Sequence, residues 1–398
     1  MQYRENPRNG DRISQLGFGC MRFPRKGIAI DQRAVDEMIR TAVEGGVNYF
    51  DTAHMYPGSE EALGRALLAT GTREGVLIAT KLPILQCHRR EDFDRILVEE
   101  LKRLRTDRID YYFMHMLCDT ATWERLGSIG IEDWIAEKKA TGAIRNAGFS
   151  FHGGRADFIR VLDAWNWDFC MVQYNYLDEN NQAGYSGIQY AHEKGLPVFV
   201  MEPLRGGQLV NRLPASAVQA FREADPSRSL AEWGLRWVWN RPEVTCVLSG
   251  MSSMEQLREN LAIAGDAVPG HLDMTAMTAY TNAVAAIDKL TKIPCTACGY
   301  CLPCPRGVDI PSCFACYNES YIGSYLSAII NYGKVTGALT PTQTDAEKCV
   351  RCGKCEPRCP QGIAIGSELV RVRRRMLTLV TKPLFRLVRR VMSRSAPR

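Results

Sequence analysis

The sequence predicts an α/β protein, a (β/α)8 barrel followed by a small, mostly helical domain that is rich in cysteine. Three observations favour this architecture. Short apolar runs alternate with amphipathic segments of helical period between residues 13 and 265. Eight such strand–helix pairs in about 250 residues match the size of a (β/α)8 barrel. Ten of the fifteen cysteines fall between Cys295 and Cys359, which indicates a separate C-terminal module.

The predicted strands are almost continuously apolar, as expected for a parallel sheet that is covered on both faces. An open doubly wound sheet is the alternative, but "GFGCMRF" at the first strand lacks the glycine fingerprint of such dinucleotide-binding sheets. Helical period is clear between strands, for example in "AVDEMIRTAVEGG" and "DFDRILVEELKRL". The predicted strands span residues 15–19, 47–51, 76–81, 109–115, 143–150, 170–175, 197–203 and 244–250.

Helical patterns continue after the eighth strand. Residues 272–292 predict one more helix, and residues 310–335 predict a helical connection between two cysteine runs. Residues 369–392 predict a basic amphipathic helix with a break at Pro383. We therefore expect three parts: a barrel domain over 1–290, a cysteine module over 291–368 and a basic tail over 369–398.

The composition is that of a globular protein, with 45 % hydrophobic and 24 % charged residues in a chain of 398. No apolar run of about 18 residues is long enough to span a membrane. The first ten residues, "MQYRENPRNG", lack the apolar core of a signal peptide. We therefore expect a cytoplasmic protein, in which fifteen cysteines remain thiols instead of forming disulfides.

Polar side chains stand at the ends of three predicted strands. Asp51 ends the second strand, Lys81 the third and His115 the fourth, and Tyr56 lies in the loop after the second. Because a (β/α)8 barrel carries its chemistry at the carboxyl ends of its strands, we expect these side chains to face one another. A lysine cation held by a carboxylate would lower the pKa of the tyrosine from about 10, while the histidine bonds a carbonyl oxygen. The pattern favours a general-acid site for carbonyl reduction.

These residues resemble the aldo-keto reductase superfamily through "DTAHMY", Lys81 and "FMH", over residues 10 to 290. The resemblance implies that Tyr56 donates the proton, that Asp51 and Lys81 tune it, and that His115 positions the substrate carbonyl. It also implies a nicotinamide cofactor, NADP(H) or NAD(H), bound without a Rossmann fold. On the same basis six residues are expected to bind that cofactor: Ser150, Gln173, Gly250, Gln256, Glu259 and Asn260.

Three positions depart from the pattern of that superfamily. Phe151 stands where the family usually has an asparagine, and Met201 stands where a tyrosine usually stacks on the nicotinamide. Gln256 stands where many members carry the arginine that binds the 2′-phosphate of NADPH. The choice between NADPH and NADH therefore stays open.

The two cysteine runs have the spacing of iron–sulfur ligands. The second run, "CVRCGKCEPRCP", is C-x2-C-x2-C-x3-C followed by Pro360, the bacterial ferredoxin pattern for a [4Fe–4S] cluster. The first run, "CTACGYCLPCP", is one residue shorter at its last step. We expect two [4Fe–4S] clusters, because structural zinc usually takes two C-x2-C pairs instead. The expected ligands are Cys295, Cys298, Cys301, Cys304, Cys349, Cys352, Cys355 and Cys359.

Two arrangements of these ligands stay open. In the crosswise one, Cys304 joins the first three cysteines of the second run, and Cys359 joins the first three of the first run. In the other, each run keeps its own four ligands. Cys313 and Cys316 are expected to be packing residues or substitute ligands. The module resembles a two-cluster ferredoxin with a longer helical linker, and the whole chain resembles a recognised subgroup of aldo-keto reductases with such a domain.

The functional hypothesis is a cytoplasmic oxidoreductase that exchanges hydride between a nicotinamide cofactor and a carbonyl or alcohol substrate, with the clusters transferring electrons. Hydride carries two electrons and a cluster takes one, so direct coupling normally needs a flavin, for which the sequence has no clear site. The clusters would then serve a redox partner protein, bind a flavin-containing protein or accept electrons from a further cofactor. One alternative is an iron–sulfur electron carrier or redox-sensing adaptor with a catalytically silent barrel as docking scaffold. Another makes the clusters purely structural.

The net charge of +6 is concentrated at the end of the chain. Ten Arg or Lys residues and no acidic residue follow Leu369, which leaves the remainder mildly acidic. Apolar residues at helical spacing among these cations favour contact with an anionic membrane surface or an acidic protein. A solvated tail is the alternative, and no recognition motif supports nucleic-acid binding.

Overall fold

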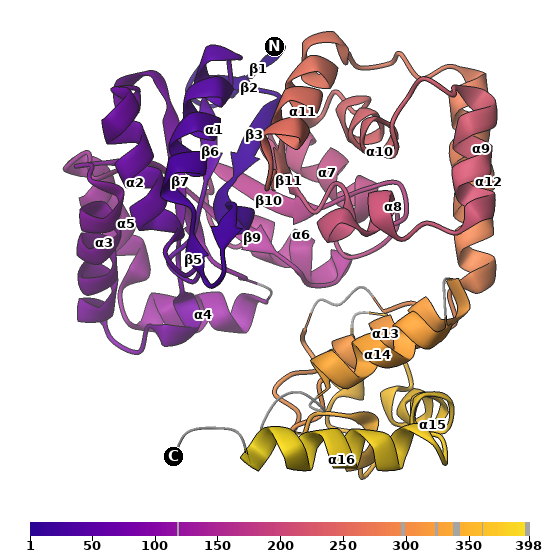
Figure 1. Cartoon of the computed structure of the whole chain (residues 1–398). Coiled ribbons are helices and arrows are strands. Elements are labelled where there is room, and N and C mark those ends of the chain that lie inside the picture. Colours follow the sequence, from indigo (N-terminus) through magenta and orange to yellow (C-terminus); the bar gives the residue numbers. More distant parts are fainter. Residues whose placement is uncertain (118, 296–298, 323–324, 337–342, 360, 395–398) are drawn as a thin grey trace. The chain divides into compact units, whose positions relative to one another are not determined.

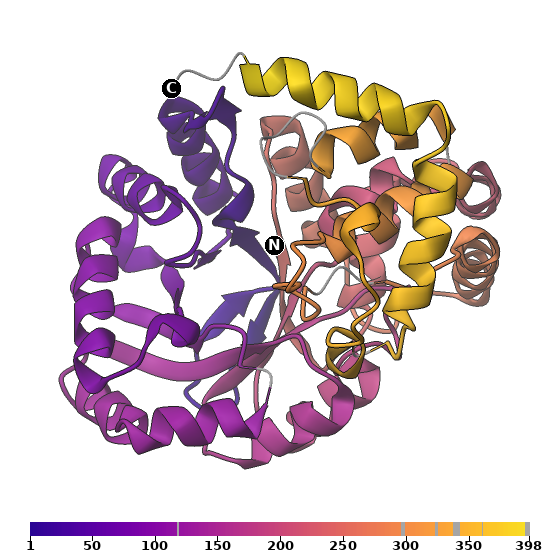
Figure 2. The ribbon, with the colours of Figure 1, turned by 90° about the horizontal axis from the view of Figure 1, so that it is seen from below.

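The protein contains a closed barrel of eight parallel strands, which confirms the predicted (β/α)8 fold (Figures 1 and 2). Each strand pairs with its neighbours in chain order and the first pairs with the last, so the sheet has no free edge. The barrel strands are β3 (Leu16–Gly19), β6 (Tyr49–Asp51), β7 (Leu77–Leu82), β8 (Ile109–Met114), β9 (Ile144–Phe151), β10 (Phe169–Gln173), β11 (Val198–Met201) and β12 (Val244–Ser249).

The computed structural model describes residues 1–117, 119–295, 299–322, 325–336, 343–359 and 361–394. The chain divides by its internal contacts into two compact units. The barrel unit comprises Met1–Val210 and Ser227–Thr275, and the C-terminal unit comprises Asn211–Pro226 and Ala276–Arg398. The predicted barrel domain over 1–290 thus includes two stretches that belong to the C-terminal unit, Asn211–Pro226 and residues 276–290. Both make most of their contacts within that unit.

Amphipathic helices cover the outside of the barrel. The Asp31 carboxylate accepts a hydrogen bond from the Ala34 amide and so caps α1, whose buried residues recur at helical spacing. Two short hairpins, β1 (Tyr3–Glu5) with β2 (Arg12–Ser14) and β4 (Arg25–Lys26) with β5 (Ala29–Ile30), accompany the barrel. Its helices are α1 (Gln32–Glu44), α2 (Ser59–Thr70), α3 (Arg90–Leu104), α4 (Thr120–Ser128), α5 (Ile131–Ala140), α6 (Arg155–Asp163), α7 (Gly184–Glu193), α10 (Leu230–Trp239) and α11 (Met254–Asp266).

Aromatic rings from alternate strands fill the barrel interior. The rings of Tyr49 and Phe199 stack with their centroids 4.6 Å apart, and Phe113 meets Phe169 edge-on at 4.6 Å. Tyr111 joins the same fully buried cluster. Side chains thus occupy the barrel axis, and polar groups can gather only at its ends.

The described residues of the C-terminal unit form helices joined by loops, and none of them lies in a strand. Helices α9 (Ala215–Ala224) and α12 (Met274–Leu290) lie side by side, with the rings of Phe221 and Tyr280 5.5 Å apart (Figure 1). Further helices surround a second apolar core, which includes Phe314 and Tyr332. They are α13 (Ile310–Ile322), α14 (Tyr325–Val335), α15 (Ile365–Met376) and α16 (Thr381–Arg394), and the short α8 (Gln208–Asn211) precedes α9.

The basic tail forms two helices that meet at a turn over residues 377–380, and the break predicted at Pro383 is wrong. Thr381 Oγ1 donates to the Met376 carbonyl at 2.7 Å and accepts from the Thr378 amide at 2.8 Å. Pro383 lies in the first turn of α16, where the missing N–H breaks no helical hydrogen bond. Leu369, Val372 and Met376 are buried in the core of the C-terminal unit, so the tail begins inside a packed helix. Among the described residues, no helix is both long and apolar enough to cross a membrane.

Replacing Gly148 tests the packing of the barrel wall. A Cβ at this position would lie 2.4 Å from the carbonyl oxygen of Phe169, which is backbone and cannot turn away. We expect Gly148→Ala to lower the free energy of unfolding by about 1–3 kcal/mol. All seven tryptophans lie in the barrel unit, so urea unfolding followed by tryptophan fluorescence reports on it. Gly75→Ala is the control, because its Cβ would meet open space, and equal losses in the two variants would contradict the packing argument.

Candidate functional site

A buried ion pair stands at the mouth of the barrel. Lys81 in β7 donates from Nζ to Asp51 Oδ1 at 2.5 Å and to the carbonyl of Thr52 at 2.6 Å. Asp51 ends the neighbouring strand β6, and the register places it beside Ala79, two residues before Lys81. Both charged side chains are buried, with exposed fractions of 2 % for Lys81 and 6 % for Asp51. Water cannot solvate them there, so each depends on the other for stabilisation of its charge.

Tyr56 and His115 lie next to this pair. The Lys81 ammonium is 5.3 Å from the ring centroid of Tyr56, and the rings of Tyr56 and His115 are nearly perpendicular with centroids 6.1 Å apart. Both aromatic residues are half-buried, whereas Lys81 and Asp51 are buried behind them. The structure therefore brings all four predicted side chains together, with the tyrosine and the histidine reachable from the mouth.

Burial decides the protonation of Tyr56. It raises the pKa of the phenol and outweighs the opposite effect of the Lys81 cation, with Asp51 and Glu202 adding to the rise. The Lys81 cation thus lowers the Tyr56 pKa as predicted, but burial reverses the net direction, and the phenol keeps its proton at neutral pH. Burial also lowers the pKa of Lys81, but Asp51 and Tyr56 outweigh it, so the pKa is raised and the amine stays charged.

His115 is held neutral. Burial, the Lys81 cation and the nearby His152 together lower its pKa to about 3. A neutral imidazole donates one hydrogen bond and accepts another, so it can bind an oxygen atom without adding charge to the site.

Two residues predicted to bind the cofactor lie near the carboxyl ends of the strands β9 and β10. Ser150 Oγ accepts a hydrogen bond from the Met116 amide at 3.0 Å. Gln173 donates to Asp178 at 2.8 Å and accepts from Gln182 at 3.0 Å. Both side chains are buried, so each is fixed in one orientation at the same end of the barrel as the ion pair.

The remaining cofactor candidates lie at the end of β12 and on α11. Gly250 directly follows the strand, and Gln256 accepts a hydrogen bond from the Ser252 amide at 2.8 Å. Asn260 is buried and donates to Ser249 Oγ at 2.8 Å, and Glu259 is half-buried beside it. These residues share the C-terminal end of the barrel with the ion pair.

Sequence reasoning missed Glu202, Arg22 and His152. Glu202 directly follows β11 and is near enough to Tyr56 to raise the pKa of the phenol. The Arg22 side chain lies against two glycines, since a Cβ at Gly206 would be 2.8 Å from its guanidinium and one at Gly250 would be 3.1 Å from its Cδ. The rule that identified Asp51, a polar residue closing an apolar strand, would also have identified Glu202.

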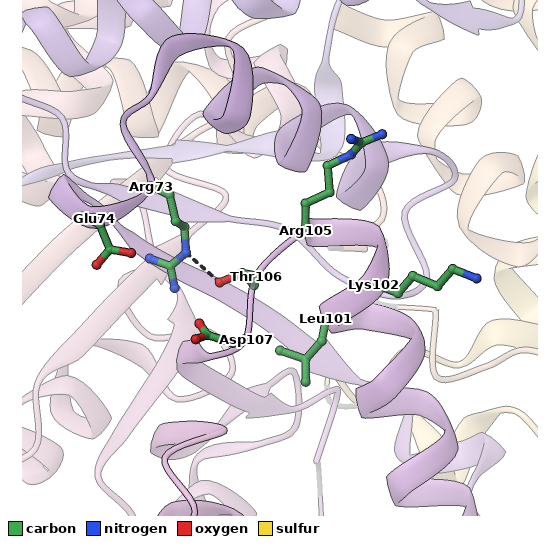
Figure 3. A pocket seen from close by; sticks show the side chains of 7 residues that line it. All are labelled: Arg73, Glu74, Leu101, Lys102, Arg105, Thr106 and Asp107. Atoms are coloured by element: carbon green, nitrogen blue, oxygen red, sulfur yellow. Dashed lines mark hydrogen bonds between the residues drawn. The ribbon is translucent and has the colours of Figure 1, made fainter.

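A cavity of about 490 Å³ lies at the opposite end of the barrel (Figure 3). It is lined by residues that precede β7 and β8, among them Arg73 and Thr106. The Arg73 guanidinium donates to Thr106 at 2.8 Å and pairs with Asp110 at 3.1 Å. Its charge is therefore neutralised within the protein and stabilises the fold. The amino ends of barrel strands usually contribute stability, and the candidate site remains the mouth with the ion pair.

Both cysteine runs pack against the core of the C-terminal unit. Cys352 is exposed. The predicted ligand Cys298 and Pro360, which follows the second run, lie outside the described residues. Cys313 and Cys316 are buried in the core itself, as expected for packing residues. No three candidate ligands converge on a single ion within the part of the chain that the structure describes. The half-buried predicted ligands are Cys295, Cys301, Cys304, Cys349, Cys355 and Cys359.

The two runs also approach each other. Burial raises the pKa of the Cys355 thiol, and Glu356, Cys349 and Cys304 add to the rise, which indicates that the two runs lie near each other. The Arg351 amide donates to Cys349 Sγ at 3.4 Å, the kind of contact that stabilises a thiolate. Closely spaced thiols with backbone donors suit an iron–sulfur cluster.

Comparisons with known proteins agree with both parts. The profile of the "Aldo/keto reductase family" matches residues 15–268, and that of the "4Fe-4S dicluster domain" matches residues 294–364. An uncharacterized oxidoreductase of Bacillus subtilis is 26 % identical over 66 % of this chain and 90 % of its own. An uncharacterized oxidoreductase of Schizosaccharomyces pombe is 26 % identical over 64 % of this chain and 82 % of its own. The solved structure of an aldo-keto reductase from Bacillus halodurans in its holo form is 26 % identical, with a TM-score of 0.58, and the match covers 71 % of this chain and 96 % of that one.

The lowered pKa of His115 predicts an acid-dependent loss of stability. The imidazole has a pKa of about 3 in the folded state and about 6.5 in an unfolded chain. Between these values the unfolded state binds more protons, so the free energy of unfolding falls as the pH falls. We expect His115→Gln to lose less stability than the wild type between about pH 7 and about pH 4.5 in urea unfolding. His192→Gln on the exposed face of α7 is the control, and parallel curves for His115→Gln and the wild type would contradict the assignment.

Proposed function

The chain belongs to the aldo/keto reductase family, and from that membership we propose that it is a cytoplasmic NAD(P)-dependent oxidoreductase acting on a carbonyl or alcohol substrate. The observation that carries the proposal is the Lys81–Asp51 ion pair beside Tyr56 and His115. A protonated phenol, a fixed cation and a neutral imidazole are the groups that carbonyl reduction needs at one oxygen atom.

In this mechanism Tyr56 moves the proton. Its Oη gives a proton to the carbonyl oxygen of the substrate as that oxygen gains negative charge, and takes it back in the reverse direction. The Lys81 cation, held by Asp51 and the Thr52 carbonyl, stabilises the charge left on Tyr56. His115 donates a hydrogen bond to the same carbonyl oxygen and so orients the substrate.

The residues at the mouth fit a nicotinamide dinucleotide. Arg22 and the glycines at 206 and 250 make a cradle in the loops after β11 and β12, where (β/α)8 barrels commonly bind phosphate. Ser150 and Gln173 would hold the carboxamide, and Gln256, Glu259 and Asn260 would bind the adenosine side. When bound, the nicotinamide supplies or accepts hydride. The proposal covers NADP(H) and NAD(H) alike, because Gln256 carries no charge that would select a phosphate.

For the C-terminal unit we propose two [4Fe–4S] clusters in a domain over residues 291–368, with crosswise ligation. Support comes from the dicluster match and from the two runs lying near each other. When bound, such clusters pass single electrons. Thiolate ligands of this kind persist in a reducing compartment, which is the physical reason for placing the protein in the cytoplasm.

The surface around Cys352 suits an acidic, one-electron carrier protein as redox partner. Cys352 is exposed, and so are the cations Arg351, Lys354 and Arg358. The intervening Glu356 accepts a hydrogen bond from the Gly366 amide at 2.9 Å, which draws its carboxylate toward α15. An exposed ligand within a cationic rim favours electron exchange with a negatively charged partner.

A second candidate function is an iron–sulfur electron carrier or redox sensor with a silent barrel. The hydrogen bonds of Gln173 favour it, because its amide already donates to Asp178 and accepts from Gln182. A cofactor would have to share these contacts. The two candidate functions differ in whether Tyr56 is needed.

Tyr56→Phe distinguishes these functions. We expect NADPH- or NADH-dependent reduction of a panel of aliphatic and aromatic aldehydes to fall about 10²–10⁴-fold, because the proton donor is lost. Nucleotide binding, measured by calorimetry, should change little. Tyr190→Phe on the outer helix α7 loses the bond to Asp163 and the contact of its hydroxyl with Lys194, and it should keep full activity. Equal rates for Tyr56→Phe and the wild type would contradict the mechanism.

Iron counts on paired alanine variants test the crosswise ligation. Cys304→Ala with Cys349→Ala removes two ligands of one proposed cluster, so about four irons per chain should remain after anaerobic purification. Cys304→Ala with Cys295→Ala removes one ligand from each cluster and should leave almost none. If each run holds its own cluster, the two double variants exchange these results.

A further inference from the structure

The turn between α15 and α16 exposes apolar side chains among cations. Leu379 is 97 % exposed and Val380 is 74 % exposed within the turn itself. Leu384 and Leu387, three residues apart on one face of α16, are 50 % and 59 % exposed. Contiguous exposed apolar groups of this kind usually mark a surface that another molecule covers. We refer to these four residues as the docking face.

The opposite faces of the two helices are already packed, so the docking face is not a misplaced part of the core. On α15, Arg375 donates to Ser320 Oγ at 2.6 Å and lies 3.9 Å from the ring centroid of Tyr321. On α16, Phe385 packs against Gly333 and lies with its ring centroid 6.3 Å from that of Tyr332. The turn is therefore presented on two anchored helices.

The charges near the docking face limit which kind of molecule can cover it. Ten Arg or Lys residues and no acidic residue follow Leu369. Lys382 and Arg386 on α16 pair with Glu347, while Arg373 and Arg374 in the last turn of α15 are exposed. A second copy of the chain would bring like charges together, which is unfavourable. An occupant with both apolar and anionic groups would complement this face.

We propose that the docking face binds the surface of an anionic lipid membrane. Leu379, Val380, Leu384 and Leu387 enter the boundary between headgroups and acyl chains, and Arg373 and Arg374 contact lipid phosphates. The turn lies on the surface of the bilayer without crossing it. The inference is independent of the proposed reaction and adds a location at which the iron–sulfur unit would meet its redox partner.

Co-sedimentation of the full-length holoprotein with vesicles tests this proposal. We expect binding to vesicles of phosphatidylcholine mixed with phosphatidylglycerol, little binding to phosphatidylcholine alone, and release at about 0.5 M salt. Leu379→Glu with Val380→Glu should weaken binding at least about tenfold, because it removes the apolar contact and adds two negative charges. These side chains are exposed, so the melting temperature and iron content should match the wild type.

The matched control is Leu68→Glu with Val98→Glu on the barrel helices. Both residues are 64 % exposed, and the variant adds the same charge elsewhere, so it should bind vesicles like the wild type. Leu384→Ala with Leu387→Ala keeps the charge and should still weaken binding. The proposal would be overturned if the wild-type protein did not bind anionic vesicles, or if the control variant lost as much vesicle binding as Leu379→Glu with Val380→Glu. The proposal would also be overturned if soluble polyglutamate fully displaced the protein from vesicles while the leucine variants bound vesicles like the wild type. That result would indicate an acidic protein as the partner.

Discussion

The closed register of the eight parallel strands is the constraint on which the candidate site depends. Successive side chains of a strand point to opposite faces of the sheet, so a slip of one residue in β7 would turn Lys81 away from Asp51. Closure of the barrel excludes such a slip, because every strand is paired on both sides. The aromatic interior adds a second restraint, since Tyr49 and Phe199 must stack within it. The strand register therefore fixes the ion pair at the mouth, at the carboxyl ends of the strands.

Burial then sets the chemistry of the mouth. Lys81 keeps its charge because Asp51 and Tyr56 outweigh the effect of burial, and that charge helps to hold His115 neutral. The same desolvation keeps the proton on Tyr56. Glu202 beside it adopts a positive φ of 57°, a conformation that non-glycine residues hold only where surrounding contacts impose it. One buried cation thus lies beside a protonated phenol and helps to keep the neighbouring imidazole neutral.

The C-terminal unit follows a different physical plan. Cysteines from runs more than forty residues apart in sequence pack against one apolar core, which α15 completes with Leu369 and Val372. The proposed clusters would therefore share a core with the first basic helix, and the second basic helix is anchored to it by Phe385. The barrel site suits two-electron chemistry and the cysteine runs suit single electrons. A partner protein or an intermediate electron carrier must connect the hydride chemistry of the barrel with the one-electron chemistry of the clusters. The exposed cationic surface around Cys352 is where we propose that such a partner binds.

The sequence by itself determined the order of the strands, the four residues at the mouth and the two cysteine runs. Each of these depends on local pattern: apolar runs of strand length, polar residues where those runs end, and ligands at short spacing. Only the tertiary structure decided that the pKa of Tyr56 rises, that Arg22 reaches the mouth, and that the tail breaks before Pro383 and not at it. These outcomes depend on desolvation and on contacts between residues far apart in the chain. Neither can be evaluated before the barrel closes and its neighbours are in place.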